Sequence, residues 1–344
     1  MFKMIIWFII LAVIVVKIYK IIQNTKALNK GISYINKGEH QKAINIFSHF
    51  ISSMRKPYSP YAFRGLVYLK EKKINKAMSD LSRSLEIHPD PFTNMPYIGV
   101  MYCKLNEYEL AAKYFFKAVE YNPKSSLTNC NLAWYYCATK EYEKAIESLN
   151  KAMQGNKIYR QKIIDAIYVN FSKAYIGLGD YDKAIEYISK ALVMNPKRGG
   201  AYINYANLLV KKGDFLLAKE YALKAIELDA YDETPYKILA EISLMKEEYD
   251  EFYKNFKLFS EKKVLDINER DIEDSIYDKV RDEERFKELI KEKEVTFTWN
   301  KLNIAPADTA LFDKVYKKQK VTTIIGVLSL IILIVILILL TTVF

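Results

Sequence analysis

The stretch from Asp165 to Arg198, DAIYVNFSKAYIGLGDYDKAIEYISKALVMNPKR, decides the fold of this chain. It contains two segments in which apolar and small residues recur at steps of three and four, which predicts two helices that each bury one face. A short break from Gly177 to Asp180 separates them, and Pro196 closes the stretch because it has no N–H with which to continue a helix. The stretch therefore predicts an antiparallel pair of helices.

The same pattern recurs along the chain in one register. The alanine at position 184 has counterparts in five other segments, at successive steps of 34, 34, 34, 39 and 34 residues. A small residue lies twelve positions before each alanine, and an aromatic residue lies nine positions before all but the last, where Leu209 replaces it. The alanines are Ala43, Ala77, Ala111, Ala145, Ala184 and Ala218, and the small residues are Gly31, Gly65, Gly99, Ala133, Ser172 and Ala206.

This pattern resembles the tetratricopeptide repeat (TPR), whose period is about 34 residues. The resemblance covers residues 24–266 and implies an all-α, right-handed α-solenoid of about seven helix hairpins, starting near residues 24, 58, 92, 126, 165, 199 and 233. Repeats four and five are separated by an excess of five residues around positions 156–164. The seventh repeat has Phe252, Phe256 and Phe259 where small residues stand elsewhere, which suits a terminal repeat. We expect residues 267–294 to lay a capping helical segment on it and residues 295–320 to form a spacer.

The two ends of the chain are hydrophobic. Residues 1–23 hold an unbroken apolar run from Met4 to Val16, followed by Lys17 and Lys20. The run is short for a membrane span, but no small-x-small cleavage site follows it, which favours a transmembrane signal anchor over a removed signal peptide. Residues 321–344 contain no charge over 24 positions, and as a helix they would extend about 36 Å. They predict a second transmembrane helix at the C-terminus.

Lysines lie on the repeat side of both hydrophobic ends. They are Lys17, Lys20, Lys26 and Lys30 after the first, and Lys314, Lys317, Lys318 and Lys320 before the second. Because positive charge near a span marks its cytoplasmic side, both clusters predict a protein of the cell membrane whose repeats face the cytoplasm.

Composition and motifs argue against several function classes. The formal net charge is +11, but the lysines alternate with acidic residues and form no Arg-rich run with interleaved aromatics, so nucleic-acid binding is not expected. Cys103, Cys130 and Cys137 suit packing rather than a disulfide framework or a metal site. No nucleophile elbow, phosphate loop, dinucleotide fingerprint or metal-binding histidine pair occurs, so we predict no enzyme activity, no catalytic residues, no cofactor and no metal.

The resemblance points to the concave groove as the binding surface. In TPR proteins the first helix of each repeat lines this groove, and in some an asparagine ladder bonds an extended peptide. Asn131, Asn170 and Asn204 match that position in successive repeats, with Asn207 one turn further on. An amide offers a donor and an acceptor to a peptide unit, although an asparagine is also simply common at this position of the motif. The same register places Trp134, Lys173 and Lys211 in the groove, whereas the full lysine–asparagine–arginine clamp of chaperone-binding TPRs is not matched.

These observations predict a membrane-anchored scaffold that binds peptide or protein partners through its concave groove at the cytoplasmic face, with partners that are themselves associated with the membrane. Two alternatives stay open. One is an adaptor subunit that delivers substrates to a membrane enzyme. The other is an exported solenoid, which would follow if the N-terminal segment were cleaved.

Overall fold

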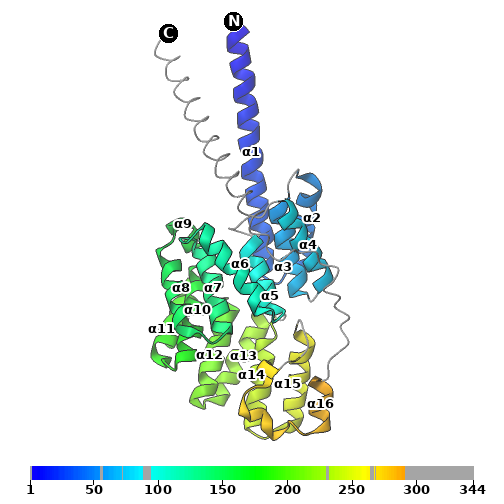
Figure 1. The fold of residues 1–344 in the computed structure, drawn as a ribbon, viewed down its shortest axis with the longest axis vertical. Helices are drawn as coiled ribbons and strands as arrows, with labels where there is room; N and C mark the ends of the chain where they lie inside the picture. Colours follow the sequence, from blue (N-terminus) through cyan, green and yellow to red (C-terminus); the bar gives the residue numbers. More distant parts are fainter. Residues whose placement is uncertain are drawn as a thin grey trace.

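The computed structural model of this protein describes residues 2–54, 57–71, 73–87, 94–229, 232–263, 267 and 269–290. These residues form sixteen α-helices, two 3₁₀-helices and no strand. Successive antiparallel pairs of helices stack side by side into a curled solenoid, and the first helix projects from one end of it (Figure 1). The described residues therefore form an all-helical TPR-like solenoid.

Seven helix hairpins make up the part of the chain that the structure describes. Each first helix packs on the second helix of its own hairpin and on the first helix of the next. The hairpins are α1 (Phe2–Asn36) with α2 (His40–Ser53), α3 (Tyr58–Lys70) with α4 (Ile74–Ile87), α5 (Asn94–Lys104) with α6 (Tyr108–Tyr121), α7 (Ser126–Ala138) with α8 (Tyr142–Gln154), α10 (Ile164–Leu178) with α11 (Tyr181–Met194), α12 (Gly199–Lys212) with α13 (Phe215–Leu228), and α14 (Thr234–Met245) with α15 (Tyr249–Lys262).

The small residues of the repeat register lie where two helices touch. All six recurring alanines are completely buried. A Cβ atom built on Gly31 would lie 2.7 Å from the ring of Phe47, and one built on Gly99 would lie 2.8 Å from the ring of Phe115. In each case the small residue of the first helix faces the residue sixteen positions later on the second helix. The recurring small residue is therefore required by the close approach within a hairpin.

The turn inside a hairpin contains one residue with left-handed backbone conformation. Gly179 and Gly213 have φ of 78° and 81°, and Lys140 takes the same role in the fourth hairpin with φ of 62°. In the fifth hairpin the side chain of Asp180 then accepts a hydrogen bond from the backbone N–H of Lys183 at 3.2 Å, which caps α11. The turn residues thus reverse the chain and start the second helix within four positions.

The first hairpin begins with one long helix. The predicted boundary between an anchor at residues 1–23 and a first repeat from residue 24 lies inside α1, which runs from Phe2 to Asn36. Its last turns pack Leu28, Ile32 and Ile35 against α2 and α3, and its first part projects beyond the repeats (Figure 1). The helix continues because residues 17–30 contain neither proline nor glycine.

Among the described residues, no helix combines the length and the apolar character that crossing a membrane requires. Most side chains of the predicted N-terminal anchor lie outside the described residues. The predicted spacer and the predicted C-terminal span fall within residues 291–344, all of which also lie outside them.

The capping segment is built from short pieces rather than one helix. It comprises the 3₁₀-helices η1 (Glu269–Ile272) and η2 (Ser275–Lys279) and the helix α16 (Glu284–Ile290). Tyr277 and Phe286 are completely buried, and their ring centroids lie 5.9 and 5.1 Å from that of Phe256 on α15. The Tyr277 hydroxyl donates to Glu241 Oε1 at 3.0 Å, so this polar group is satisfied inside the cap. The aromatic residues that replace the small ones in the seventh repeat therefore form the surface on which the cap packs.

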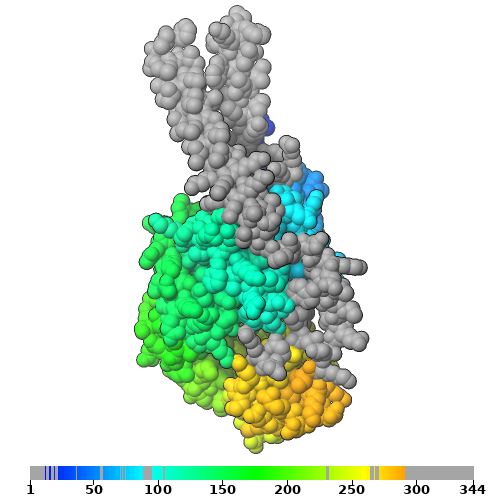
Figure 2. All heavy atoms as spheres, in the orientation of Figure 1, coloured from blue at the N-terminus to red at the C-terminus, as the bar shows by residue number. Residues whose placement is uncertain are grey.

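The solenoid curls far enough for its end to reach its middle. Lys140, in the turn of the fourth hairpin, forms an ion pair with Glu273 between η1 and η2, with 2.6 Å between Nζ and Oε1. In the space-filling view the yellow and orange residues of the seventh hairpin and the cap form the lower end of the repeat body (Figure 2). The earlier repeats therefore bound the concave surface on one side, and the seventh hairpin with the cap bounds it on the other.

Candidate functional site: a cavity inside the solenoid

A cavity of about 660 Å³ occupies the concave side of the solenoid. One wall comes from the first helices of the second to fifth hairpins, and the opposite wall comes from α14, the end of α15 and η1. Asn131, Trp134, Asn170 and Lys173 all line the first wall. Sequence analysis predicts these four as groove residues, and the structure brings them together in one cavity.

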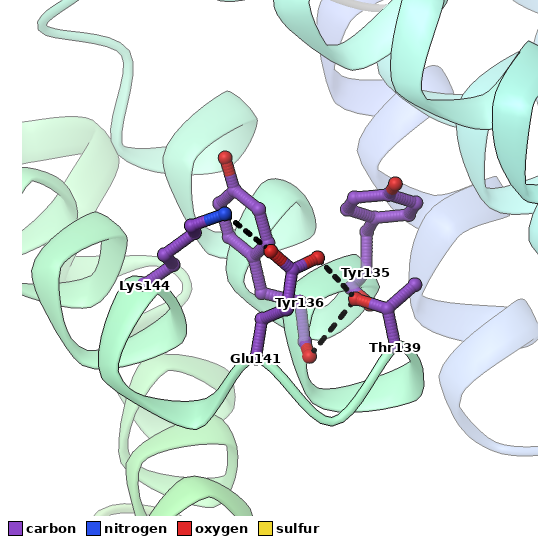
Figure 3. A network of polar contacts seen from close by, with 5 residues as sticks. All are labelled: Tyr135, Tyr136, Thr139, Glu141 and Lys144. Atoms are coloured by element: carbon purple, nitrogen blue, oxygen red, sulfur yellow. Dashed lines mark hydrogen bonds and ion pairs between the residues drawn. The ribbon is translucent and has the colours of Figure 1, made fainter.

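A polar network holds the turn that joins this wall to the cap (Figure 3). Thr139 Oγ1 donates to Glu141 Oε1 at 2.9 Å, and it also lies 3.3 Å from the backbone oxygens of Tyr135 and Tyr136. Lys144 donates to the other carboxylate oxygen of Glu141, and this hydrogen bond is the main reason that the pKa of Glu141 is lowered. The network fixes the backbone on both sides of Lys140, the residue that pairs with Glu273. It therefore fixes the turn from which Lys140 reaches the cap.

Asn131 has an amide nitrogen that donates to nothing. Its Nδ2 atom is buried and has no hydrogen-bond partner among the described residues. Trp134 lies less than one helical turn further along α7, and both residues face the same cavity. A buried donor without an acceptor costs about 1–3 kcal/mol, so Asn131 is a polar residue of this wall that would gain from an added acceptor if its side chain turned toward the cavity.

Asn170 and Asn204 use their amide nitrogens within the protein. Asn170 Nδ2 donates to the backbone oxygen of Cys130 at 3.1 Å, and Asn204 Nδ2 donates to the backbone oxygen of Val169 and to Ser172 Oγ, both at 2.8 Å. Each asparagine thus bonds the residue that precedes the corresponding asparagine of the previous repeat. The predicted ladder exists, but at these two rungs the donors join neighbouring helices of the solenoid instead of facing a free groove.

The remaining predicted groove residues lie elsewhere. Asn204 is buried between α10 and α12, Asn207 is half-buried and Lys211 is exposed near the end of α12. None of the three lines the cavity. The assignment of Asn204, Asn207 and Lys211 to a peptide-binding groove therefore stays a prediction, separate from the cavity that Asn131 lines.

Lys173 brings a cationic group to the cavity without a carboxylate partner among the described residues. Its ammonium nitrogen lies 6.0 Å from the centre of the Trp134 ring, within the range of a cation–π contact. The other wall is different, because Lys263 pairs with Asp271 at 2.9 Å and Lys237 pairs with Glu241 at 3.6 Å. The first wall thus contains an amide donor without a partner, an aromatic ring, and a cation that contacts this ring and has no carboxylate partner among the described residues.

The cysteines beside this wall are packed thiols. Burial raises the pKa of Cys103 and Cys130 to about 12 and that of Cys137 to about 11. All three are free and buried. Within the part of the chain that the structure describes, no group of three His, Cys, Asp or Glu side chains could hold a metal ion.

Sequence analysis missed the second wall of the cavity. Lys237 and Phe259 line it, and they face residues more than sixty positions earlier in the chain. The repeat register shows which face of a helix is concave, but it carries no signal for which repeats meet across the concave side.

Comparison with known proteins identifies the repeats. Family models described as tetratricopeptide repeat match residues 114–147, 166–198 and 199–232. The matched segments coincide with the fourth, fifth and sixth hairpins and part of the third. The chain thus carries tetratricopeptide repeats over these residues.

One curated relative is similar to part of the chain. The Sol locus transcriptional repressor of Clostridium acetobutylicum is 35% identical over 131 residues, which are 38% of this chain and 41% of the repressor. The match thus spans less than half of the relative's length.

Two solved structures match over part of the chain. Pseudomonas aeruginosa PilF is 21% identical, with a TM-score of 0.41 over 58% of this chain and 88% of PilF. A tetratricopeptide repeat protein from Parabacteroides merdae is 16% identical, with a TM-score of 0.47 over 70% of this chain and 93% of that protein.

Proposed function

We propose that this protein is a membrane-anchored TPR scaffold that binds an extended peptide segment of a partner protein inside the cavity. The observation that carries the proposal is the buried, unpartnered amide nitrogen of Asn131 beside Trp134 and Lys173. A peptide carbonyl would accept from this amide, and an apolar peptide side chain would pack on the indole ring. The ammonium group of Lys173 would bind a second carbonyl or an acidic side chain of the same peptide.

The proposed role is binding without catalysis, and neither a cofactor nor a nucleic acid takes part in it. The cavity suits a peptide because it is long enough to be shared by several repeats, and because its free groups are those that backbone carbonyls and apolar side chains require. An adaptor that presents substrates to a membrane enzyme would use the same surface. It would differ from a scaffold only in the partner that a pull-down recovers, which would be an enzyme.

The proposed location is the cytoplasmic face of the cell membrane, with membrane-associated partners. The uncharged run of residues 321–344, the run from Met4 to Val16 and the lysines that flank both runs support it. Within the described side chains, Val15, Val16, Tyr19 and Ile22 are exposed on the projecting part of α1. These residues follow the helical spacing i, i+1, i+4 and i+7, and an apolar stripe of this kind suits a helix that enters a lipid phase.

A pull-down from detergent-solubilised membranes tests the binding site. The cavity variant combines Asn131→Ala, Trp134→Ala and Lys173→Ala, and it should lose the partners that the wild type recovers. The matched control combines Asn207→Ala and Lys211→Ala, which remove the same types of group from residues outside the cavity, and it should retain those partners.

Circular dichroism and melting temperature establish that both variants are folded before the comparison is made. If the folded cavity variant recovers the same partners as wild type, the cavity is not the binding surface. Loss of the partners from the control alone would place binding on α12 instead.

A further inference from the structure

The five extra residues between the fourth and fifth repeats form a helix of their own. This helix, α9 (Lys157–Gln161), contains no buried residue. Ile158 and Tyr159 are 69% and 67% exposed, although both side chains are large and apolar for most of their surface. Because the insertion is outside the 34-residue register, packing between repeats does not account for these side chains.

The helix is held firmly in place. Asn156 caps it by accepting hydrogen bonds from the backbone N–H groups of Ile158 and Tyr159 at 3.0 and 3.4 Å. The guanidinium group of Arg160 donates to the backbone oxygen of Met153 at the end of α8. The exposed side chains of Ile158 and Tyr159 therefore belong to a helical turn whose backbone is fixed by hydrogen bonds at both ends.

The charged residues of α9 and its C-cap are all basic, namely Lys157, Arg160 and Lys162. Lys151, just before them, pairs with Glu147 at 2.6 Å and adds no free charge. Lys157 and Lys162 have no carboxylate partner among the described residues, whereas lysines of the neighbouring helices pair with glutamates, as Lys190 does with Glu186. Lys162 also lies over the ring of Tyr159, with Nζ 5.7 Å from its centre. A positive group of this kind complements an anionic surface.

The position of α9 in the molecule is also consistent with contact to an anionic surface. It lies at the end of the repeat body from which α1 projects (Figure 1). The end of α11 lies at the same edge, because Asn195 Nδ2 donates to Asp165 Oδ2 at 2.9 Å and Asp165 follows α9 by four residues. Val193 and Met194 at that end are also exposed, Val193 by 81%. Apolar and basic side chains from two connections between repeats therefore face the side on which the proposed anchor stands.

We propose that α9 and the adjacent end of α11 contact the surface of the anionic membrane that holds α1. Ile158 and Tyr159 enter the headgroup layer, where an aromatic ring with a polar tip is well accommodated, and Lys157 and Lys162 face the lipid phosphates. This inference rests on the proposed membrane anchoring. Its consequence is a second contact that fixes how the solenoid, and with it the cavity, is oriented relative to the bilayer.

The test uses the full chain reconstituted into vesicles, with an environment-sensitive NBD label on Tyr159→Cys. The native cysteines are buried, so the introduced thiol is labelled selectively. The label replaces one aromatic group with another while Ile158 and the lysines stay. Leu216→Cys is the matched control, because Leu216 is 81% exposed but lies at the start of α13, on the opposite edge formed by the turns within hairpins.

In vesicles that contain phosphatidylglycerol, the label at position 159 should show a blue-shifted emission that nitroxide lipids quench, and the label at position 216 should show neither effect. Adding Lys157→Glu and Lys162→Glu should abolish the shift at position 159, as should vesicles of phosphatidylcholine alone. If position 159 behaves like position 216 in vesicles that retain the chain, the contact is absent while the anchoring stands. If the chain does not float with the vesicles at all, the anchoring itself fails and the contact falls with it.

Discussion

The substitution Gly99→Ala tests whether close helix approach dictates the small residue of each repeat. A Cβ atom at this position would lie 2.8 Å from Cε1 and Cζ of Phe115 and 3.0 Å from Cδ1. Phe115 is completely buried, so its ring has no free space to enter. Overpacking of this kind costs about 1–3 kcal/mol, while replacing glycine by alanine inside a helix contributes about 1 kcal/mol in return. We expect a net loss of roughly 0–2 kcal/mol in the free energy of unfolding.

The second arm of this test is the double variant Gly99→Ala/Phe115→Leu. It reproduces the pair that the fourth hairpin uses naturally, where Ala133 stands opposite Leu149 and both are completely buried. Phe115→Leu alone should be destabilising because it leaves a cavity next to a glycine. The two changes together should therefore be less damaging than their sum, with a coupling of about 0.5–3 kcal/mol.

The measurement is urea unfolding of the full chain in detergent, followed by the helical signal in circular dichroism. Gly199→Ala is the control, because the nearest atom to its Cβ would lie 3.8 Å away, and it should leave the midpoint unchanged or raise it slightly. If the two changes at positions 99 and 115 add within about 0.5 kcal/mol, they do not interact and the packing explanation is refuted.

Three further predictions follow from the site and its surroundings. Asn204→Ala should lower the free energy of unfolding by about 1–3 kcal/mol, because two hydrogen bonds to α10 are lost. Asn131→Ala should not lower it, because the amide nitrogen of Asn131 has no partner. Equal melting temperatures of the two variants would contradict this difference. Burial raises the pKa values of Cys103, Cys130 and Cys137 from 9.0 to between about 11 and about 12, so these thiols add stability below about pH 9 that is lost as the pH rises above it. Above pH 9 the urea midpoint should therefore fall more steeply for wild type than for Cys130→Ala. Parallel curves would refute the raised pKa of the buried thiol. For the proposed topology, Leu216→Cys should resist impermeant thiol reagents in intact cells while a cysteine added after Phe344 should react, and labelling at position 216 in sealed cells would exclude a cytoplasmic solenoid.

The repeat architecture could be predicted from the sequence because its contacts are local. Each hairpin packs a small residue of its first helix against the residue sixteen positions later, and this requirement recurs with the period itself. The register of Gly31, Gly65 and Gly99 is therefore visible without any knowledge of the tertiary structure. The same holds for the turns, where Gly179 and Gly213 supply the left-handed conformation that starts the second helix.

Element boundaries at the two ends were harder to predict. The apolar run of residues 4–16 and the first repeat differ in composition, and sequence analysis separates them on that ground, but no helix-breaking residue stands between them and the backbone continues as α1. At the other end, the predicted capping helix is divided because Asp274 accepts from the backbone N–H of Ile276 at 3.1 Å and starts η2. In the resulting 3₁₀-helix, residues three apart share one face, which brings Tyr277 and Val280 into the same aromatic cluster.

The asparagines show why the site itself could be predicted only in part. An asparagine at this position of a TPR reaches back to the previous first helix, and the bonds from Asn170 and Asn204 span 40 and 35 residues, the longer one by the five inserted positions. A step of 35 residues back from Asn131 leads to Pro96, and no such bond forms there. The first asparagine of the run is thus the one whose donor remains available. The sequence does not indicate this difference, since Pro96 also has a backbone oxygen that could accept, and only the curled solenoid places Asn131 at a cavity with Lys237 and Phe259 on its far side.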